Sequence, residues 1–231
     1  MIKNVLSIFL CIFSFSLQAR DLAEDVAVRY GSIAKYEDEG TLVRITRAGG
    51  KSSRKEVTFN TKYDENGYFR FYWRESSNRY FEFNGDLDER LTEGMNSARP
   101  LSEYYFERND NVGYSNYRGR RKVIEDFCLS YAGATGISHG VAALVPRYLL
   151  ASECYDSPHL MLPKAKFKGV VKGRKIVEII YQYGGSSKLH FGESRGLLEK
   201  YEHIKKVGDQ EIETTINIVV KSVTFDSNKL L

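Results

Sequence analysis

The stretch from Val57 to Trp73 constrains most strongly how this chain can fold. Apolar and polar residues alternate on both sides of the turn Asp64 to Gly67, which contains an Asn-Gly pair. Alternation of this kind around an Asn-Gly turn predicts a β-hairpin. Phe69, Phe71 and Trp73 would share one face of its second strand, and aromatic side chains bury on the order of 150–250 Å² each. A hairpin cannot cover that surface alone, so a helix, a second sheet or a ligand must pack on it.

The first 19 residues are typical of a secretory signal peptide. Lys3 precedes the uncharged apolar run Val5 to Phe15, and Ala19 ends a short polar stretch. The apolar run is shorter than a membrane span, which predicts cleavage after Ala19; an uncleaved N-terminal anchor is the alternative. Residues 20–231 are then expected to form a single domain, soluble in the periplasm and not membrane-spanning after processing.

The charge balance argues against a nucleic-acid partner. The chain has 34 Lys and Arg against 30 Asp and Glu, and Lys3 is the one charged residue that the signal peptide would remove. The remaining surplus is small and both signs are interspersed, whereas nucleic-acid binding requires a basic patch.

Two cysteines remain after cleavage, Cys128 and Cys154. An even pair in an oxidising compartment predicts a disulfide, with two buried free thiols as the alternative. Their spacing, without a second close Cys or His pair, is not that of a metal site, and no cofactor is predicted.

The N-terminal part predicts a helix followed by a meander. Leu22, Val26, Tyr30 and Ile33 recur at helical spacing, so we expect a helix of about four turns that ends before Gly40. The strands expected next are Thr41 to Arg47, the two strands of the hairpin, and Arg79 to Phe83, which would complete a four-stranded meander by residue 85.

The middle of the chain is less regular. Gly85 to Asn96 is acidic and turn-like, Ser97 to Arg108 predicts a helix with Pro100 near its start, and Asp110 to Arg121 predicts a surface loop. Phe127 to Leu150 has no formal charge before Arg147. Its glycines and Pro146 disfavour a transmembrane helix, so we expect one or two short helices that lie over the aromatic face of the sheet.

Beyond Pro163, short alternating segments separated by glycine-containing turns predict an antiparallel meander. Together with the N-terminal strands they predict an α+β fold: one large curved antiparallel sheet of about ten strands with three or four helices. The strands expected here are Lys166 to Val171, Lys175 to Tyr183, Lys188 to Phe191, Leu197 to Lys205, Glu211 to Val220 and Ser222 to Phe225.

Catalytic signals are weak. None of the histidines left after cleavage, His139, His159, His190 and His203, has a carboxylate or another histidine at metal-ligand spacing. Ser138 and His139, with Glu125 or Asp126, supply the elements of a hydrolase triad, but we expect no serine to lie in the Gly-x-Ser-x-Gly pattern of a nucleophile elbow. The sequence therefore predicts a non-catalytic protein, with a hydrolase as the least favoured alternative.

The order of elements is similar to that of a known group of proteins. The residues that carry this similarity are Tyr30, Tyr36 and Gly40, the segments Phe59 to Tyr63 and Tyr68 to Phe71, the apolar stretch Gly136 to Leu150, and Leu197 to Ile218 with its Glu213-Thr214-Thr215 sequence. Over nearly the whole mature chain the sequence resembles the periplasmic lipoprotein-carrier superfamily, the LolA/LolB-like proteins and their uncharacterised relatives. The resemblance implies an unclosed β-barrel of about eleven strands, helices on its concave side, and a hydrophobic cavity that accepts acyl chains.

The leading hypothesis is an exported protein that binds a lipid, or the acyl chain of a lipoprotein, between the sheet and a helical cover. A plain packed core fits the same residues. The alternative function is a cell-envelope protein-interaction module with a closed core, which would act through the loop Asp110 to Arg121. The residues expected to line the cavity are Phe59, Phe69, Phe71, Trp73, Phe81 and Phe83 from the sheet and Leu144, Val145 and Leu149 from the cover.

Overall fold

The computed structural model describes residues 24–75, 80–83, 86–87, 103–109, 112–117, 120–154, 165–182 and 184–229. The predicted signal peptide, 1–19, and most of the acidic stretch from Gly85 to Asn96 lie outside these residues, so export and cleavage after Ala19 stay predictions.

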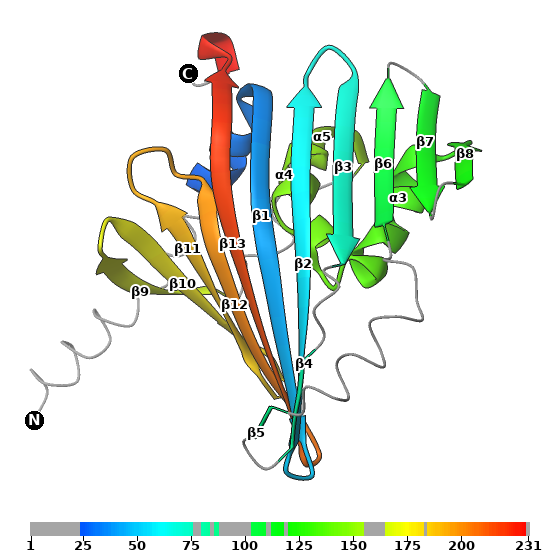
Figure 1. Cartoon of the computed structure of the whole chain (residues 1–231). Coiled ribbons are helices and arrows are strands. Elements are labelled where there is room, and N and C mark those ends of the chain that lie inside the picture. The colour runs from blue at the N-terminus through cyan, green and yellow to red at the C-terminus, as the bar shows by residue number, and fades with distance from the viewer. Residues whose placement is uncertain are drawn as a thin grey trace, which may run out of the picture.

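The described strands form one antiparallel sheet that does not close on itself (Figure 1). Its order is β8-β7-β6-β3-β2-β1-β13-β12-β11-β10-β9, with β4 beside β2 and β5 beside β4. This confirms the predicted α+β fold with one large curved sheet. The strands are β1 Ile33–Ala48, β2 Lys51–Asp64, β3 Tyr68–Glu75, β4 Tyr80–Phe83, β5 Asp86–Leu87, β6 Glu103–Asn109, β7 Val112–Tyr117, β8 Arg120–Ile124, β9 Ala165–Val171, β10 Arg174–Ile180, β11 Ser186–Gly192, β12 Leu198–Val207 and β13 Gln210–Phe225.

The predicted hairpin is present as β2 and β3. Phe59 pairs with Trp73, and Tyr63 pairs with Phe69. At the turn, the N–H of Gly67 donates to the carbonyl of Asp64 over 3.2 Å, and Gly67 has a φ of 106°. Glycine adopts this left-handed conformation without a steric penalty, so the Asn-Gly signal located the turn correctly.

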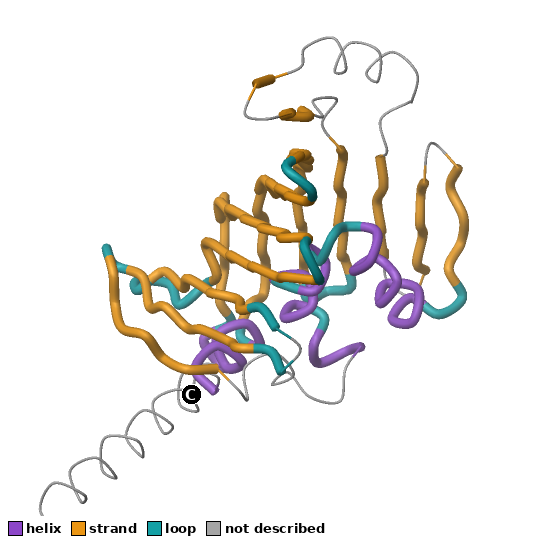
Figure 2. The backbone as a smooth tube through the Cα atoms, turned by 90° about the horizontal axis from the view of Figure 1, so that it is seen from below, coloured by secondary structure: helices purple, strands orange, loops and turns teal. Residues whose placement is uncertain are grey.

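The helices gather inside the curve of the sheet (Figure 2). The first described helix covers residues 24–31, and residues 127–154, which follow β8, are almost entirely helical. This segment confirms the short helices expected over residues 127–150. The other described helices are α3 Phe127–Ile137, η1 Val141–Ala143, α4 Val145–Leu149, α5 Ala151–Cys154 and η2 Ser227–Lys229.

The N-terminal helix is shorter than predicted. It ends at residue 31, and β1 begins at Ile33, so Gly40 lies inside a strand and is no helix terminus. Buried Tyr36 and Asp38 alternate with more exposed neighbours, which is the period of a strand. Pairing with β2 on one side and β13 on the other satisfies the backbone of this segment, and this tertiary pairing outweighs its helical periodicity.

Two predictions in the middle of the chain were wrong. The second half of the helix expected at Ser97 to Arg108 is β6, whose residues pair with β3; residues 97–102 lie outside the description. The loop expected at Asp110 to Arg121 contains β7 and the start of β8. In β7 the side chains that would face the helices are small, Gly113 and Ser115, so the strand carries no apolar alternation.

Two further differences concern strand pairing. The strand β4 pairs with the first residues of β2, which extend past the end of β3. It therefore does not pair with β3 as a fourth strand of the meander. The last two strands that the sequence predicted form one continuous strand, β13. Its pairing with β1 shifts in register at Asp38, which pairs with Val220. A bulge bends a long strand without ending it.

Candidate functional site

The face of the sheet that carries the helices, called the inner face below, is aromatic over β2, β3 and β6. Phe59 pairs with Trp73, and Phe71 pairs with Phe106. These side chains and Phe69 are buried. Four of the predicted lining residues therefore lie together in one part of the core, and β6 adds Phe106, which sequence reasoning missed because it assigned that segment to a helix.

The helical cover, residues 127–154, packs on this aromatic surface through Tyr131 of α3. The Tyr131 ring meets the rings of Phe69, Phe71 and Phe106 edge to face, at centroid distances of 5.4, 6.3 and 5.6 Å. Its hydroxyl donates to the carbonyl of Ala142 over 2.9 Å. Edge-to-face aromatic pairs contribute about 0.5–1.5 kcal/mol each beyond their burial, so Tyr131 fixes the cover on the sheet.

The predicted residues of the cover, Leu144, Val145 and Leu149, are also buried and belong to the same hydrophobic cluster. Phe81 and Phe83 lie on β4, whose side chains fall outside the described part of the chain. Seven of the nine predicted lining residues thus form one continuous apolar interior. Their role in binding a ligand stays a prediction.

Side chains attach the cover to the sheet. The predicted disulfide is present and joins Cys128 of α3 to Cys154 of α5, so it closes the cover on itself. Arg108 of β6 forms an ion pair with Glu153. Among the described residues no backbone segment of the cover is paired with a strand of the sheet. The cover is therefore a separate layer, held on the sheet by side-chain contacts and not by strand pairing.

Among the buried polar atoms without a hydrogen-bond partner in the described part of the chain are Nε1 of Trp73 and the hydroxyl of Tyr148. The Tyr148 ring stacks on Tyr30 at a centroid distance of 4.9 Å. A buried polar group without a partner costs about 1–3 kcal/mol. Both groups can donate a hydrogen bond, so the interior can receive an acceptor such as a carbonyl oxygen.

A buried carboxylate lies on the inner face of β1. The hydroxyl of Tyr36 donates to Oδ2 of Asp38 over 2.9 Å, and the N–H of Thr61 donates to Oδ1 over 2.8 Å. Burial raises the pKa of Asp38 from 3.8 to about 7, although both hydrogen bonds favour the charged form. Asp38 carries no charge over much of the acid range.

The inner face becomes polar towards the β1–β2 and β12–β13 turns. Ser187 Oγ is hydrogen-bonded to Tyr201 Oη (2.9 Å), Tyr181 Oη (3.0 Å) and His203 Nδ1 (2.9 Å). Burial holds the pKa of His203 below its ordinary value. On β1, an N–H of Arg44 donates to Nδ1 of His139 in the cover over 3.4 Å.

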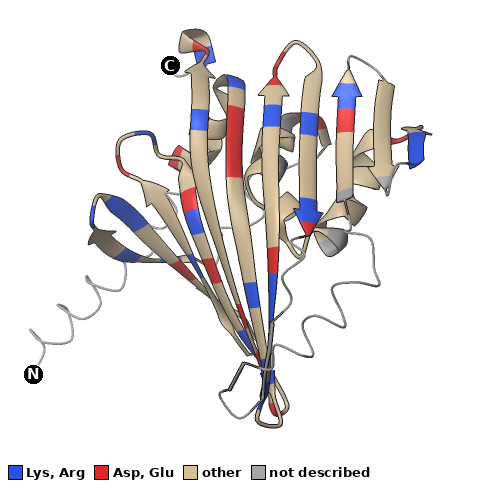
Figure 3. Ribbon diagram, in the orientation of Figure 1, with Lys and Arg blue, Asp and Glu red and all other residues tan. Residues whose placement is uncertain are grey.

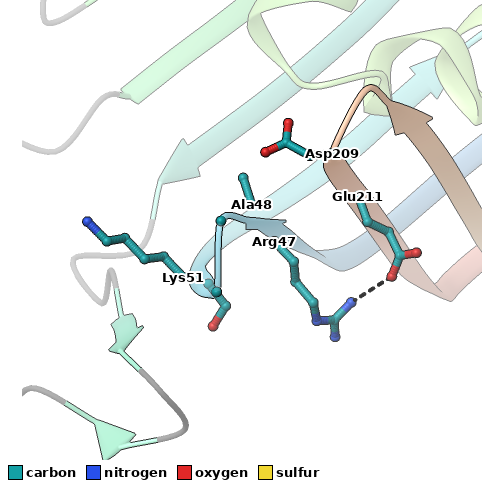
Figure 4. A pocket seen from close by; sticks show the side chains of 8 residues that line it. Arg47, Ala48, Lys51, Asp209 and Glu211 are labelled. Atoms are coloured by element: carbon teal, nitrogen blue, oxygen red, sulfur yellow. Dashed lines mark hydrogen bonds and ion pairs between the residues drawn. The ribbon is translucent and has the colours of Figure 1, made fainter.

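Two clefts lie away from the aromatic interior. One, of about 450 Å³, lies between the β1–β2 and β12–β13 turns and is lined by Arg47, Lys51, Asp209 and Glu211 among others (Figure 4). The other, of about 300 Å³, lies over β10 to β13 and includes Glu178 and several other charged residues. Neither cleft is lined by a residue that the sequence analysis assigned to the lipid site.

The sequence from Gly136 to Gly140 does match the pattern Gly-x-Ser-x-Gly, so the expectation that no serine would carry this signal was wrong. Its structural context is not that of a nucleophile elbow, which lies between a strand and a helix. Ser138 follows α3, is fully buried, and accepts the N–H of Ala142 with its hydroxyl at 3.0 Å. It stabilises the turn into η1.

The remaining histidine positions agree with ordinary sheet roles. His190 Nε2 lies 2.8 Å from Glu202 Oε2. His159 lies outside the described residues. Within the part of the chain that the structure describes, no group of histidine, cysteine and carboxylate side chains could hold a metal ion. No helix in that part is long and apolar enough to cross a membrane.

Comparison with known sequences finds no relative: no family model and no curated protein matches the chain. Among solved structures, MucB is similar with 12% identity over 93% of this chain and a TM-score of 0.40. This chain spans 62% of that MucB chain.

Two further structures are similar along most of both chains. A putative outer membrane lipoprotein-sorting protein domain from Vibrio parahaemolyticus has 12% identity, with 92% of this chain and 94% of that chain covered and a TM-score of 0.29. LprF from Mycobacterium bovis has 9% identity, with 87% and 91% covered and a TM-score of 0.28. A lipoprotein-sorting domain is thus among the neighbours. Such distant similarity carries no argument about function, so we argue function from this chain's own residues.

Proposed function

We propose that this chain is an exported, non-catalytic protein that holds an acyl chain of a lipid or lipoprotein between the inner face of the sheet and the helical cover. The observation that carries the proposal is the separate cover on an aromatic sheet face. Phe71 and Trp73 lie on the sheet side, and Leu149 and Tyr148 lie on the cover side. Displacing such a cover exposes a large apolar surface and leaves the strand ladder intact.

The energetics favour a long apolar ligand. Each buried methylene contributes about 0.8 kcal/mol, so an acyl chain can offset the cost of separating the cover from the sheet. Trp73 Nε1 and the Tyr148 hydroxyl lack hydrogen-bond partners among the described residues. The ester or amide carbonyls of a lipid supply the acceptors that these donors require. The polar end of the acyl chain would therefore lie near Trp73 or Tyr148.

Purification from an oxidising compartment tests the proposal directly. The chain from Arg20 onward is purified and analysed by native mass spectrometry, and bound material is extracted under denaturing conditions. We expect about one lipid per chain, or uptake of a fluorescent fatty acid by protein that lost its lipid. A clean protein mass together with no uptake would show that the aromatic interior is an ordinary core.

Tyr148→Phe separates binding from folding. The variant removes a hydroxyl that has no hydrogen-bond partner among the described residues and keeps the ring that stacks on Tyr30, so thermal stability should be maintained or rise. Retention of an ester-linked lipid should fall several-fold. Tyr105→Phe on β6 is the control, because Tyr105 neighbours the inward-facing Phe106 in the strand and so lies on the opposite face, where Arg70 of β3 packs over its ring. Equal lipid retention in both variants would contradict the assignment of Tyr148.

A second candidate function, interaction with an envelope protein, has its own supporting observation. Among the described residues β8 pairs only with β7, so its other side is a sheet edge. Arg120, Arg121 and Lys122 make this edge basic (Figure 3), and Val123 is 67% exposed beside them. An extended acidic segment of a partner could add to such an edge as a further strand.

Charge reversal distinguishes this second function. The triple variant Arg120→Glu, Arg121→Glu, Lys122→Glu should lose an envelope partner in pull-down experiments. The same change at Lys166 and Lys168 of β9, the opposite edge, should keep it. A partner retained by both variants would exclude the β8 edge as its binding surface. The lipid function predicts that neither variant changes lipid binding.

A further inference from the structure

A row of polar side chains crosses the inner face of five neighbouring strands. The register places Lys55 of β2 beside Arg44 of β1, Arg44 beside Thr214 of β13, Thr214 beside His203 of β12, and His203 beside Ser187 of β11. All these residues lie on the same face, because residues that pair directly across strands point to the same side of a sheet.

The adjacent row on the same face is apolar. It is displaced from the polar row by two residues on each strand. In it, Val57 pairs with Leu42, Leu42 with Ile216, Ile216 with Tyr201, and Tyr201 with Leu189. Four of these five side chains are fully buried, and Tyr201 packs partly against the same core. The inner face therefore changes from apolar to polar within one step along the strands.

The polar row is also positively charged. Lys55 is neutralised by an ion pair with Glu75, but Arg44 forms no ion pair with a carboxylate among the described residues. Lys205, two residues after His203 on the same strand, is exposed and likewise has no such ion pair within the described part. Besides burial, the charges of Lys205 and Arg44 lower the pKa of His203, which places both cations near its ring.

The site is held in place by its neighbours. Ser187 is buried and its hydroxyl contacts His203, Tyr201 and Tyr181 at 2.9–3.0 Å, so the imidazole is fixed against β11. Arg44 is partly exposed and reaches His139, which adopts a left-handed backbone conformation with a φ of 55° in the turn between α3 and η1 of the cover. The guanidinium thus lies where the cover meets the polar row.

We infer that Arg44, Thr214 and His203 of the polar row, with Lys205 beside them, form an anion-binding row that takes a phosphate or carboxylate group at the polar end of the inner face. Guanidinium groups bind both anions with two parallel hydrogen bonds, and a nearby ammonium adds charge. Because the row borders the apolar interior, the headgroup of an acidic amphiphile fits it. This inference deepens the proposed lipid-binding function and rests on it for the acyl part of the ligand.

Calorimetric titrations with three probes separate the contribution of the anion to binding from that of the acyl chain. Each amphiphile is kept below its critical micelle concentration. Dodecyl phosphate carries both, dodecylphosphocholine carries the chain with a zwitterionic headgroup, and inorganic phosphate carries the anion alone. We expect the full chain to bind dodecyl phosphate about tenfold more tightly than dodecylphosphocholine. Arg44→Gln and Lys205→Gln should each remove most of that difference without changing affinity for dodecylphosphocholine.

Two control variants support the interpretation. Arg44→Lys keeps the charge and should retain part of the preference for dodecyl phosphate. Lys188 lies one residue from Ser187 and on the opposite face of β11, so Lys188→Gln should retain the whole preference. Arg44 also contacts the cover, so Arg44→Gln could change binding by disturbing the cover. Lys205 lies further from the apolar row, so a loss of preference in Lys205→Gln would reflect the lost charge. Circular dichroism confirms that each variant is folded.

The outcomes are distinct. Equal affinity for the two amphiphiles, or a preference that survives both Gln variants, overturns the anion-binding row and leaves the lipid function standing. Arg44-dependent binding of inorganic phosphate without tighter binding of either amphiphile supports the row with a free anion as ligand and overturns the acyl part. No binding of any probe overturns both.

Discussion

At the scale of single residues, Asp38 makes stability depend on pH. Its pKa is 3.8 in an exposed chain and about 7 in the folded protein. Between these values the unfolded chain has lost the proton that the folded chain keeps. Stability contributed by this group is therefore complete below about pH 4 and is lost as the pH rises towards 7, with a total on the order of 4 kcal/mol.

Asp38→Asn should remove this dependence. An asparagine amide can accept the N–H of Thr61 and donate to the Tyr36 hydroxyl, so it imitates the neutral acid. We expect the variant to be about as stable as the parent chain near pH 4 and more stable by about 4 kcal/mol at pH 8. Urea denaturation at both pH values gives the comparison, and parallel pH profiles would show that Asp38 is not a buried neutral acid.

Gly40 and Gly133 illustrate two opposite uses of glycine. A Cβ added at Gly40 would lie 2.2 Å from Cζ of Phe59 and 2.4 Å from the carbonyl oxygen of Asn217, and the latter belongs to the backbone of β13. Gly40→Ala should therefore cost about 2–3 kcal/mol of unfolding free energy. At Gly133 in α3 a Cβ meets no atom within 4 Å, and Gly133→Ala should stabilise by about 0.5–1 kcal/mol.

Denaturant titration of the two alanine variants tests this pair. Opposite signs are expected, and a neutral Gly40→Ala would mean that the Phe59 ring does not lie over β1. The sequence could not separate these two roles. Gly40 was interpreted as the end of a helix because close contact across strands, here with Phe59 and Asn217, leaves no local signal.

At the scale of elements, the predictions succeeded in segments where apolar and polar residues alternate over a short stretch of sequence. The β2–β3 hairpin and the strands after Pro163, apart from the break expected within β13, were located correctly because they show period-two hydrophobicity between glycine-containing turns. The strands β6 and β7 were missed because tyrosines, charges and small residues obscure the period, as at Tyr104 and Ser115. Their order in the sheet follows from pairing partners far away in the chain.

The candidate site was predicted in part for the same reason. Phe71 and Leu149 were recognised as apolar residues of two segments that had to meet, and they share one core. Tyr131 was not named, although it contacts three aromatic rings, because a tyrosine in an uncharged segment gives no indication of which way it points. The polar row at Arg44 requires the register of five strands, which no local pattern contains.

The disulfide between α3 and α5 gives a prediction for the cover as an element. The two cysteines are 26 residues apart, and in the loop-entropy model closure of such a loop stabilises by about 3 kcal/mol. The double variant Cys128→Ala, Cys154→Ala should lose about this amount in non-reducing urea titrations. Reduction of the parent chain should lower its midpoint to that of the variant, and an unchanged midpoint would contradict a structural role for the bond.

At the scale of the whole molecule, the two halves of the sheet join through β1 and β13, each 16 residues long. The strands from β2 to β8 lie on one side of this pair and those from β9 to β12 on the other. One hydrophobic cluster spans both sides, from Phe71 to Leu189. A continuous ladder and a shared core predict that the halves unfold together, without a stable half-folded state.

Leu189→Ala tests this cooperativity because the chain has a single tryptophan, Trp73, in the other half. Leu189 is buried on β11, and its truncation should cost about 2–5 kcal/mol. Trp73 fluorescence and far-ultraviolet circular dichroism should shift to the same lower urea midpoint. A fluorescence midpoint that stays at the parent value while circular dichroism shifts would mean that the β1–β13 pair separates two independently folding halves, and that the cover responds to only one of them.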